Sequence, residues 1–332
     1  MQILLNIFLL TGTVIGAGIF SLPSVFSKLG SIFYILLLIL GFLTAYMGVK
    51  YYQLIKTVGK QKQMPTYIKE SLGKFWGKTA LVLFASSLAG ALISYLLLIK
   101  EQIGDIFFFL ALNWGLLSLN PKLLRRFDGL LTIALISSII MLILQNQQAS
   151  LLPEFPAIET LNLEDIAKSY GVVLFSFTGF SIIPDLLPKG KVKLSIFISY
   201  IIIGLIYLYF GNFVKLNQSM LMQVVIFFAV TTSYVPLSFV LEETLNKDLG
   251  LKKLLSKTTS LFIPVAVVAL NMTDFISALS ITGGIFISFL QILIISAYIK
   301  KIGAKTKIEK ILLYATIFIF FAGALSELYF LF

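Results

Sequence analysis

Glycine residues cluster in the first long apolar stretch of the sequence. Gly12, Gly16 and Gly18 lie within seven residues of the segment 11–23, and Pro23 follows five positions later. Each glycine costs a helix interior about 1 kcal/mol relative to alanine, so such a cluster needs a compensating purpose. In lipid, backbone groups freed by a helix break must find partners inside the protein or at a water-filled cavity. We therefore predict a break here and interpret it as a binding site.

The chemistry of such a break suits an anionic group. The start of a half-helix carries a partial positive charge and free N–H groups, which favour a carboxylate. Thr13 could add a hydroxyl. The alternative is close helix packing through small residues, for which Gly12 and Gly16 have the right spacing. The predicted backbone donors are Gly16, Ala17, Gly18 and Ile19.

A second stretch of the same kind lies at 174–185. Ser176, Thr178 and Ser181 supply hydroxyls, Gly179 gives access to the backbone, and Pro184 follows. We expect carbonyl groups freed there to accept hydrogen bonds from a substrate ammonium group.

The elements that position these stretches must be membrane helices. Of the 332 residues, 58% are hydrophobic and only 12% are charged, whereas soluble domains carry roughly 25% charged residues. The sequence has no cysteine and no histidine, which argues against thiolate or histidine metal sites and disfavours a membrane enzyme. We expect one all-α, polytopic transmembrane domain over residues 1–332.

Hydropathy predicts eleven spans, each close to the length that crosses the hydrocarbon core. The fourth and ninth runs are nearer 15 residues than 20. The first run lacks a basic leader and a cleavage site, so we expect a retained helix. The runs are Ile3 to Lys28, Ser31 to Leu54, Gly77 to Ile99, Asp105 to Leu119, Leu123 to Leu144, Asp165 to Leu187, Leu194 to Val214, Ser219 to Leu241, Thr258 to Met272, Phe275 to Ile299 and Ile311 to Phe332.

The distribution of basic residues supports this count and sets the orientation. Cytoplasmic loops collect Lys and Arg. With the N-terminus inside, all but four of the 26 Lys and Arg residues fall on the cytoplasmic side, the exceptions being Lys28, Lys100, Lys168 and Lys215. The net charge of +11 is then topological and lipid-facing, which argues against a nucleic-acid partner. We predict a multi-pass protein of the cell membrane with a cytoplasmic N-terminus and an extracytoplasmic C-terminus.

The two glycine stretches lie five spans apart, so the second enters the membrane from the opposite side. Interrupted helices at matching places in two halves indicate a transporter site at the membrane midplane. We predict inverted repeats at 1–144 and 165–299, with 311–332 an additional helix. Between the spans, 64–75 is either a short interfacial helix or a solvated loop, and we expect 146–163 to pack over the outer mouth.

The segments GTVIGAGIFSLP, from Gly12 to Pro23, and FSFTGF, from Phe175 to Phe180, together resemble the first and sixth helices of the amino acid/polyamine/organocation transporter superfamily. The pattern is most similar to its aromatic and hydroxy amino acid permease and amino acid/auxin permease branches. The resemblance implies a LeuT-type fold with helices 1 and 6 broken at mid-membrane, alternating access and an amino acid substrate.

The resemblance also implies roles for individual residues. Phe175 matches an aromatic lid over the substrate, Ser87 or Gly90 would set the pocket size, and Asp185 would act in gating or carry protons. For each, the alternative is structural: a core or lipid-facing ring for Phe175, and an ion pair with Lys189 for Asp185.

An ion site is implied beside the first break. In sodium-coupled members of the fold, hydroxyls of the eighth helix and carbonyls of the first break hold the ion. The corresponding residues here are Ile15, Gly16, Thr231, Thr232 and Ser233. The alternative is that these hydroxyls bond carbonyls of their own helix. Because Gly12 stands where some sodium-coupled relatives carry asparagine, the coupling ion is left as Na⁺ or H⁺.

We predict an ion-coupled symporter of a neutral or aromatic amino acid, because no acid or base at mid-depth could pair a charged substrate side chain. It would work as a monomer among membrane lipids, without a cofactor. The alternative is a nutrient receptor of the spore-germination type, which binds an amino acid without net transport.

Overall fold

The computed structural model describes residues 2–59, 63–117, 133–142, 162–186, 191–214 and 219–331, and every regular element in these ranges is helical. The first part of the chain forms α1 (Gln2–Val14), the 3₁₀ turn η1 (Ala17–Ser21), α2 (Leu22–Leu29), α3 (Ile32–Val58), α4 (Met64–Leu72), α5 (Lys74–Gln102) and α6 (Ile106–Leu117). An unlabelled helix covers Ile133–Leu142.

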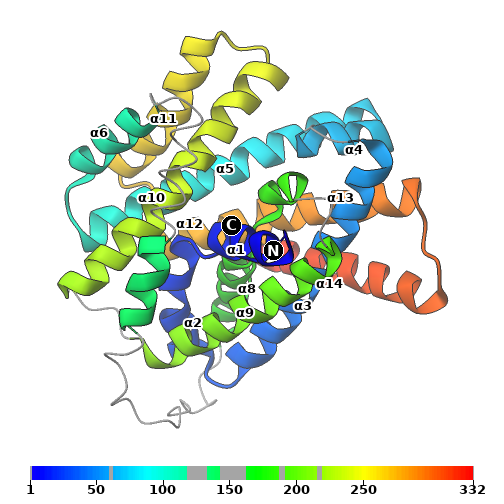
Figure 1. Ribbon diagram of the computed structural model, residues 1–332, viewed down its shortest axis with the longest axis horizontal. Helices are drawn as coiled ribbons and strands as arrows, with labels where there is room; N and C mark the ends of the chain where they lie inside the picture. The colour runs from blue at the N-terminus through cyan, green and yellow to red at the C-terminus, as the bar shows by residue number, and fades with distance from the viewer. Residues whose placement is uncertain are drawn as a thin grey trace.

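The second part begins with α8 (Leu163–Ser176), the 3₁₀ turn η3 (Phe180–Asp185), α9 (Val192–Phe213), α10 (Met220–Glu243) and the π-helical turn η4 (Thr244–Asp248). It continues with α11 (Lys253–Ala269), α12 (Phe275–Ile281), the π-helical segment η5 (Thr282–Ile287), α13 (Ser288–Lys301) and α14 (Lys307–Leu331). Figure 1 shows α1 and α8 in the middle of the bundle, with α6 and α11 together at one edge.

The structure confirms a multi-pass helical membrane protein. Each of the eleven predicted runs contains a helix in the described residues. Seven of these helices are long and apolar enough to span a membrane, or eight if the bent pair α1 and α2 counts as one span. The count of eleven and the division into inverted repeats at 1–144 and 165–299 therefore remain predictions. The segment 146–161 lies outside the described residues.

The first predicted break is present. α1 ends at Val14, Gly16 adopts an extended backbone (φ −121°, ψ −150°), and the chain re-enters a helix through η1 and α2 at an angle of 52°. Pro23 stands in the first turn of α2, where its missing N–H costs no hydrogen bond. The glycines thus interrupt the helix, and the proline restarts it.

The second break has the same form. α8 begins at an Asn162 cap, whose side chain accepts a hydrogen bond from the Glu164 N–H at 3.1 Å. It ends at Ser176, and after Thr178 and Gly179 the chain continues as η3, which contains Pro184. In both breaks a glycine lies within the interruption, Gly16 in the first and Gly179 in the second, and a proline follows in the next helical turns.

The segment 64–75, for which the sequence allows either a short interfacial helix or a solvated loop, is helical over Met64–Leu72 and forms α4. This short helix packs against α5 and α13, and its Tyr67 ring meets Tyr51 of α3 edge to face at 5.9 Å. Gly73 makes the sharp turn into α5 with φ +107°, a conformation that favours glycine.

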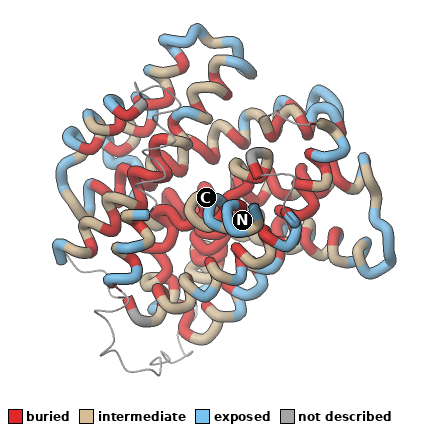
Figure 2. The backbone as a smooth tube through the Cα atoms, in the orientation of Figure 1, coloured by how far each residue is buried: buried red, intermediate tan, exposed pale blue. Residues whose placement is uncertain are grey.

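The outer surface of the bundle is apolar. Large hydrophobic side chains such as Leu38, Phe107, Phe262 and Phe318 are more than half exposed, as expected for a lipid-facing surface. Buried residues gather in the interior, around α1 and α8 (Figure 2).

A polar cluster ties the ends of three helices together. The ammonium group of Lys50 in α3 pairs with Glu309 of α14. It also lies 4.7 Å from the ring centre of Tyr46 and 4.9 Å from that of Tyr298 in α13. The Tyr298 hydroxyl donates to Glu309 at 2.9 Å. A buried lysine is tolerated here because a carboxylate and two aromatic faces share its charge.

Candidate functional site

The two broken helices touch each other at their breaks. A Cβ built on Gly18 would lie 2.6 Å from Ser176 Oγ and 2.9 Å from the Ser176 Cα. On the other side, a Cβ on Gly179 would overlap the Val14 side chain. Glycine is therefore required at both positions by close approach, because each break occupies the space that a side chain on the other would need.

Two tyrosines of α9 bond the carbonyl groups at these breaks. The buried Tyr207 hydroxyl lies 3.1 Å from the carbonyl oxygen of Val14 and 2.6 Å from that of Ser176, so it joins the last carbonyls of α1 and α8. The Tyr200 hydroxyl donates to the Phe177 carbonyl at 3.1 Å. These bonds supply the partners that broken helices need in a low-dielectric interior.

Gly16, in the first break, lies against α5 and α10. A Cβ on Gly16 would lie 2.8 Å from the Tyr95 hydroxyl and 3.0 Å from Ser233 Oγ. The Tyr95 ring meets Phe175 edge to face at 6.3 Å. Ser233 Oγ is buried without a hydrogen bond of good geometry in the part of the chain that the structure describes. Four elements thus converge at one point: the first break, α5, α8 and α10.

The other predicted hydroxyls donate to their own helices. Thr13 donates to the Leu9 carbonyl at 2.8 Å, and Thr178 to the Leu174 carbonyl at 2.9 Å. The remaining pairs are Ser176 to Val172 at 2.9 Å, Thr231 to Phe227 at 2.7 Å and Thr232 to Phe228 at 2.9 Å. With their hydrogens engaged, these oxygens present only lone pairs. They can accept from an ammonium group or bind a cation, but they cannot donate to a carboxylate in this arrangement.

The predicted backbone donors lie at the first break, and their binding of an anion remains a prediction. Ala17, Gly18 and Ile19 open η1, and all three are buried. The first N–H groups of a helix have no acceptor within it. The Gly16 N–H already donates to the Val14 carbonyl at 2.9 Å, and the Ile19 N–H donates to the Gly16 carbonyl at 3.4 Å. Ala17 and Gly18 are therefore the donors of η1 that a carboxylate would use. The Ile15 N–H is engaged with the Thr11 carbonyl at 3.0 Å.

The predicted residues of α5 lie apart from this point. Ser87 is buried and donates to the Phe84 carbonyl at 2.8 Å. Gly90 faces η5, where a Cβ would overlap Thr282, and lines a cavity of about 250 Å³ between α5 and α12. Asp185 ends η3, and its side chain and the whole of Lys189 lie outside the described residues. All of these roles remain predictions.

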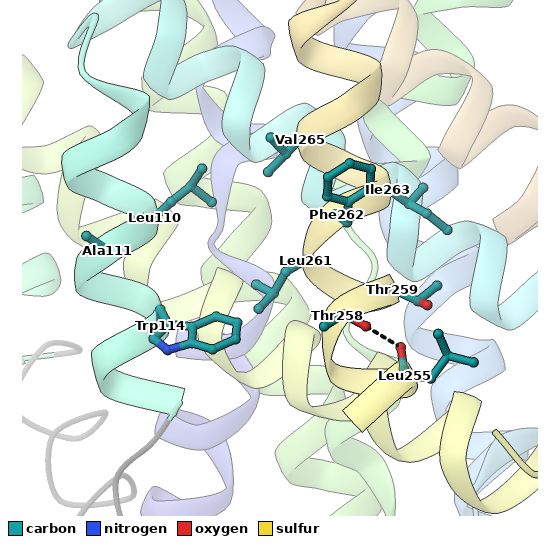
Figure 3. Close-up of a pocket in the computed structure, with 10 residues that line it drawn as sticks. All are labelled: Leu110, Ala111, Trp114, Leu255, Thr258, Thr259, Leu261, Phe262, Ile263 and Val265. Atoms are coloured by element: carbon teal, nitrogen blue, oxygen red, sulfur yellow. Dashed lines mark hydrogen bonds between the residues drawn. The ribbon is translucent and has the colours of Figure 1, made fainter. Parts of the chain in front are cut away.

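A larger hollow, of about 600 Å³, lies between α6 and α11 (Figure 3). Its walls are almost wholly apolar, and the hydroxyl of Thr258 beside it donates to the Leu255 carbonyl at 3.0 Å. None of its lining residues belongs to either break. This position, between two helices at the edge of the bundle (Figure 1), suits a lipid chain better than a polar substrate.

Sequence reasoning missed the tyrosines of the site. No role is predicted from the sequence for Tyr95, Tyr200 or Tyr207, although all three contact the breaks. The available signal was spacing: Tyr200 and Tyr207 are seven residues apart, two helical turns, and therefore share a face of α9.

Comparison with known proteins agrees with this geometry. The model of a family described as transmembrane amino acid transporter protein matches residues 3–145. The manganese transporter of Eremococcus coleocola, solved in complex with an aromatic bis-isothiourea substituted compound, superposes with a TM-score of 0.60. That alignment covers 97% of this chain and 84% of the transporter at 10% sequence identity. Among curated proteins, no significant sequence match is found.

The family match confirms the predicted resemblance to the amino acid/polyamine/organocation superfamily, without distinguishing its branches. The structural neighbour shows that the two chains share a fold. Together they support a multi-pass membrane transporter for a small molecule.

Proposed function

We propose that this chain, whose residues 3–145 match the amino acid transporter family, is a secondary active transporter that carries a neutral or aromatic amino acid. Uptake would be driven by a Na⁺ or H⁺ gradient and would proceed by alternating access. The N-terminus would be cytoplasmic and the C-terminus extracytoplasmic.

The observation that carries the proposal is the contact of two broken helices, Gly18 against Ser176, beside Tyr95 and Ser233. This arrangement offers N–H groups for a carboxylate at η1 and oxygen lone pairs of Ser176 and Thr178 for an ammonium group. An amino acid carries both groups on one carbon atom. Its side chain would then point toward Phe175, which is the reason for favouring an uncharged or aromatic substrate.

The residues at the breaks favour an amino acid over a metal ion. Neither 11–23 nor 174–185 contains a histidine, cysteine or methionine, and their single acidic residue is Asp185, at the far end of η3 from the break. Divalent transition metals are bound by imidazole, thiolate or carboxylate groups. The manganese cargo of the structural neighbour is therefore not carried over to this chain.

A screen of the twenty amino acids by thermal shift, with and without Na⁺, would identify the substrate, because a ligand that binds only the native state raises its stability. The amino acid found should then accumulate in proteoliposomes under an ion gradient. Binding without accumulation would support the nutrient-receptor alternative. Neither binding nor accumulation of any amino acid would contradict the proposal.

Gly16→Leu tests the site directly, and Gly204→Leu is its matched control. A side chain at Gly16 meets Tyr95 and Ser233, whereas one at Gly204 of α9 meets open space. We expect the Gly16 variant to reach the membrane but lose binding and uptake, and the Gly204 variant to keep both. Normal uptake by Gly16→Leu would show that the first break is not part of the binding site.

A further inference from the structure

The last helix, α14, is at least partly exposed along most of its length but packs one side against α8, α13 and η5. A Cβ on Gly323 would overlap the ring of Tyr170 in α8. The Tyr170 hydroxyl in turn lies 2.9 Å from Ser288 Oγ at the start of α13. α14 therefore contacts both the second broken helix and the π-helical segment η5.

Glu327 of α14 is buried at this junction, with 5% of its surface exposed. Its Cγ would lie 2.9 Å from a Cβ on Gly284, so the carboxyl group occupies a recess that this glycine of η5 leaves open. Oε1 lies 2.6 Å from the hydroxyl of Ser280 in α12. Oε2 has no hydrogen-bond partner among the described residues.

Counting hydrogens at Ser280 indicates the charge state of the carboxyl group. The Ser280 hydroxyl has one hydrogen and lies near two acceptors, the Lys168 carbonyl oxygen at 3.0 Å and Glu327 Oε1 at 2.6 Å. If Ser280 donates to the carbonyl, the short contact with Glu327 needs a hydrogen on the carboxyl group. A neutral acid satisfies both contacts and leaves Oε2 as an uncharged carbonyl oxygen, whereas in a carboxylate the same buried oxygen would share a negative charge without a donor.

The cation that acts on the Glu327 carboxyl group is Lys168 of α8, whose charge is shared with Glu164. Of the elements packed against Glu327, α8 brings Lys168 and Tyr170. The Lys168 ammonium is paired with Glu164 at 2.7 Å, and the Tyr170 hydroxyl is engaged with Ser288. α12 and η5 contain no charged residue. The ionisable groups of α13, Tyr298, Lys300 and Lys301, lie at its far end, with Tyr298 in the Lys50 cluster.

We infer that Glu327 is a proton-binding site, outside the repeated core, whose occupancy is coupled to movement of α8 against η5. In the closed arrangement the carboxyl group holds its proton and donates to Ser280. When α8 moves away, water reaches the carboxyl group and takes the proton from Oε1, which leaves a hydrated carboxylate. The π-helical form of η5 fits such a role, since π-bulges occur frequently at functional sites.

The proton site itself can be tested without transport. In reconstituted protein at neutral pH, the infrared C=O band of a protonated carboxylic acid should be present, and Glu327→Gln should remove it. Glu243→Gln, which alters an acid paired with Lys247 at 2.6 Å, should leave the band unchanged. Persistence of the full band in Glu327→Gln would overturn the inference.

Ser280→Ala is a second variant that keeps the acid. The band should shift because the carboxyl group loses its acceptor, and an unshifted band would contradict the hydrogen bond on which the inference rests. If Glu327→Gln fails to fold, the band of Ser280→Ala still tests whether Glu327 is protonated and bonded to Ser280.

The coupling rests on the proposed transport function and needs its own measurement. In proteoliposomes, Glu327→Gln should keep substrate exchange at equal pH but lose the extra accumulation that an inward proton gradient gives. Accumulation that still follows the gradient would overturn the coupling. Absence of amino acid transport in the wild type would contradict the proposed function while leaving the infrared result on Glu327 intact.

Discussion

At the scale of single residues, Tyr207 has the largest predicted effect on the breaks. Its hydroxyl contacts the last carbonyls of both α1 and α8, and the residue is fully buried. Tyr207→Phe should lower the free energy of unfolding by about 1–3 kcal/mol, because the one hydroxyl hydrogen that two buried carbonyl groups share is lost. Tyr200→Phe, which affects only the Phe177 carbonyl, should cost less. Thermal unfolding of both variants in detergent measures the difference, and equal losses would contradict the bridging role.

The hydroxyls of α10 separate into two kinds that can be compared directly. Thr231 donates to its own helix, whereas Ser233 faces Gly16 without such a bond. If the coupling cation lies beside the first break, Ser233→Ala should raise the cation concentration needed for uptake, and Thr231→Ala should leave it nearly unchanged. Cation titrations of uptake in proteoliposomes give the comparison. A larger effect of Thr231→Ala would place the cation elsewhere.

Residue types predicted where the helix breaks lie but not which atoms face them. Gly16 and Gly18 were identified because glycine is costly in a helix and therefore informative. By contrast, the run Thr231 to Ser233 contains three hydroxyls of similar chemistry, and only tertiary packing decides that Ser233 points to Gly16. The contacts of Tyr95 and Tyr207 are likewise long-range, so no local pattern contains them.

At the scale of elements, helix interruptions were predictable and helix irregularities were not. Both breaks combine glycine with a following proline, and these two residues change backbone energetics locally. The π-helical segment η5 carries Gly283 and Gly284, but the reason for its form lies in contacts with Gly171 and Glu327. A feature imposed by neighbouring helices leaves only a weak signal in its own sequence.

The stability of the first turn of α12 depends on pH, because the turn is capped by the side chain of Asp274. The side chain of Asp274 accepts hydrogen bonds from the Ser277 N–H at 3.0 Å and from the Ser277 hydroxyl at 2.6 Å. Burial alone would raise the pKa of Asp274, but these bonds outweigh it and hold the pKa below its usual value of 3.8. The folded pKa is therefore lower than the unfolded one.

The cap consequently stabilises the protein fully above the unfolded pKa, and this contribution is lost as the pH falls through the folded pKa. Asp274→Ala should cost about 1 kcal/mol at neutral pH and less in acid. Unfolding measured across the acid range checks the prediction. A loss that stays constant with pH would show that the charge of Asp274 does not contribute.

At the scale of the whole molecule, α14 connects parts that the predicted repeats treat as separate. Its first turn holds Lys50 of α3 through Glu309, and its last turns receive Tyr170 and Ser280 through Gly323 and Glu327. Hydropathy indicated this helix as an addition to the core, because composition does not reveal what an apolar helix packs against. The contacts make it a link between both halves.

The number of membrane crossings determines on which sides the two termini lie. An odd number, such as eleven, places them on opposite sides, whereas eight would place them on the same side. The distribution of Lys and Arg favours eleven, because moving a single span would scatter the basic residues over both faces. Three short helices decide between the counts, because none of them reaches 18 residues in the described part of the chain: α6, the unlabelled helix Ile133–Leu142 and α11.

Single-cysteine labelling can settle the topology cleanly, because the natural sequence contains no cysteine. We expect Gln2→Cys to react with a membrane-impermeant thiol reagent only from the cytoplasmic side, and Tyr329→Cys, at a position 77% exposed, only from the outer side. Lys253→Cys, at the basic start of α11, should match Gln2→Cys. If both termini are labelled from the same side, at least one of the eleven predicted spans does not cross the membrane, and the inverted relation of the two breaks has to be derived anew.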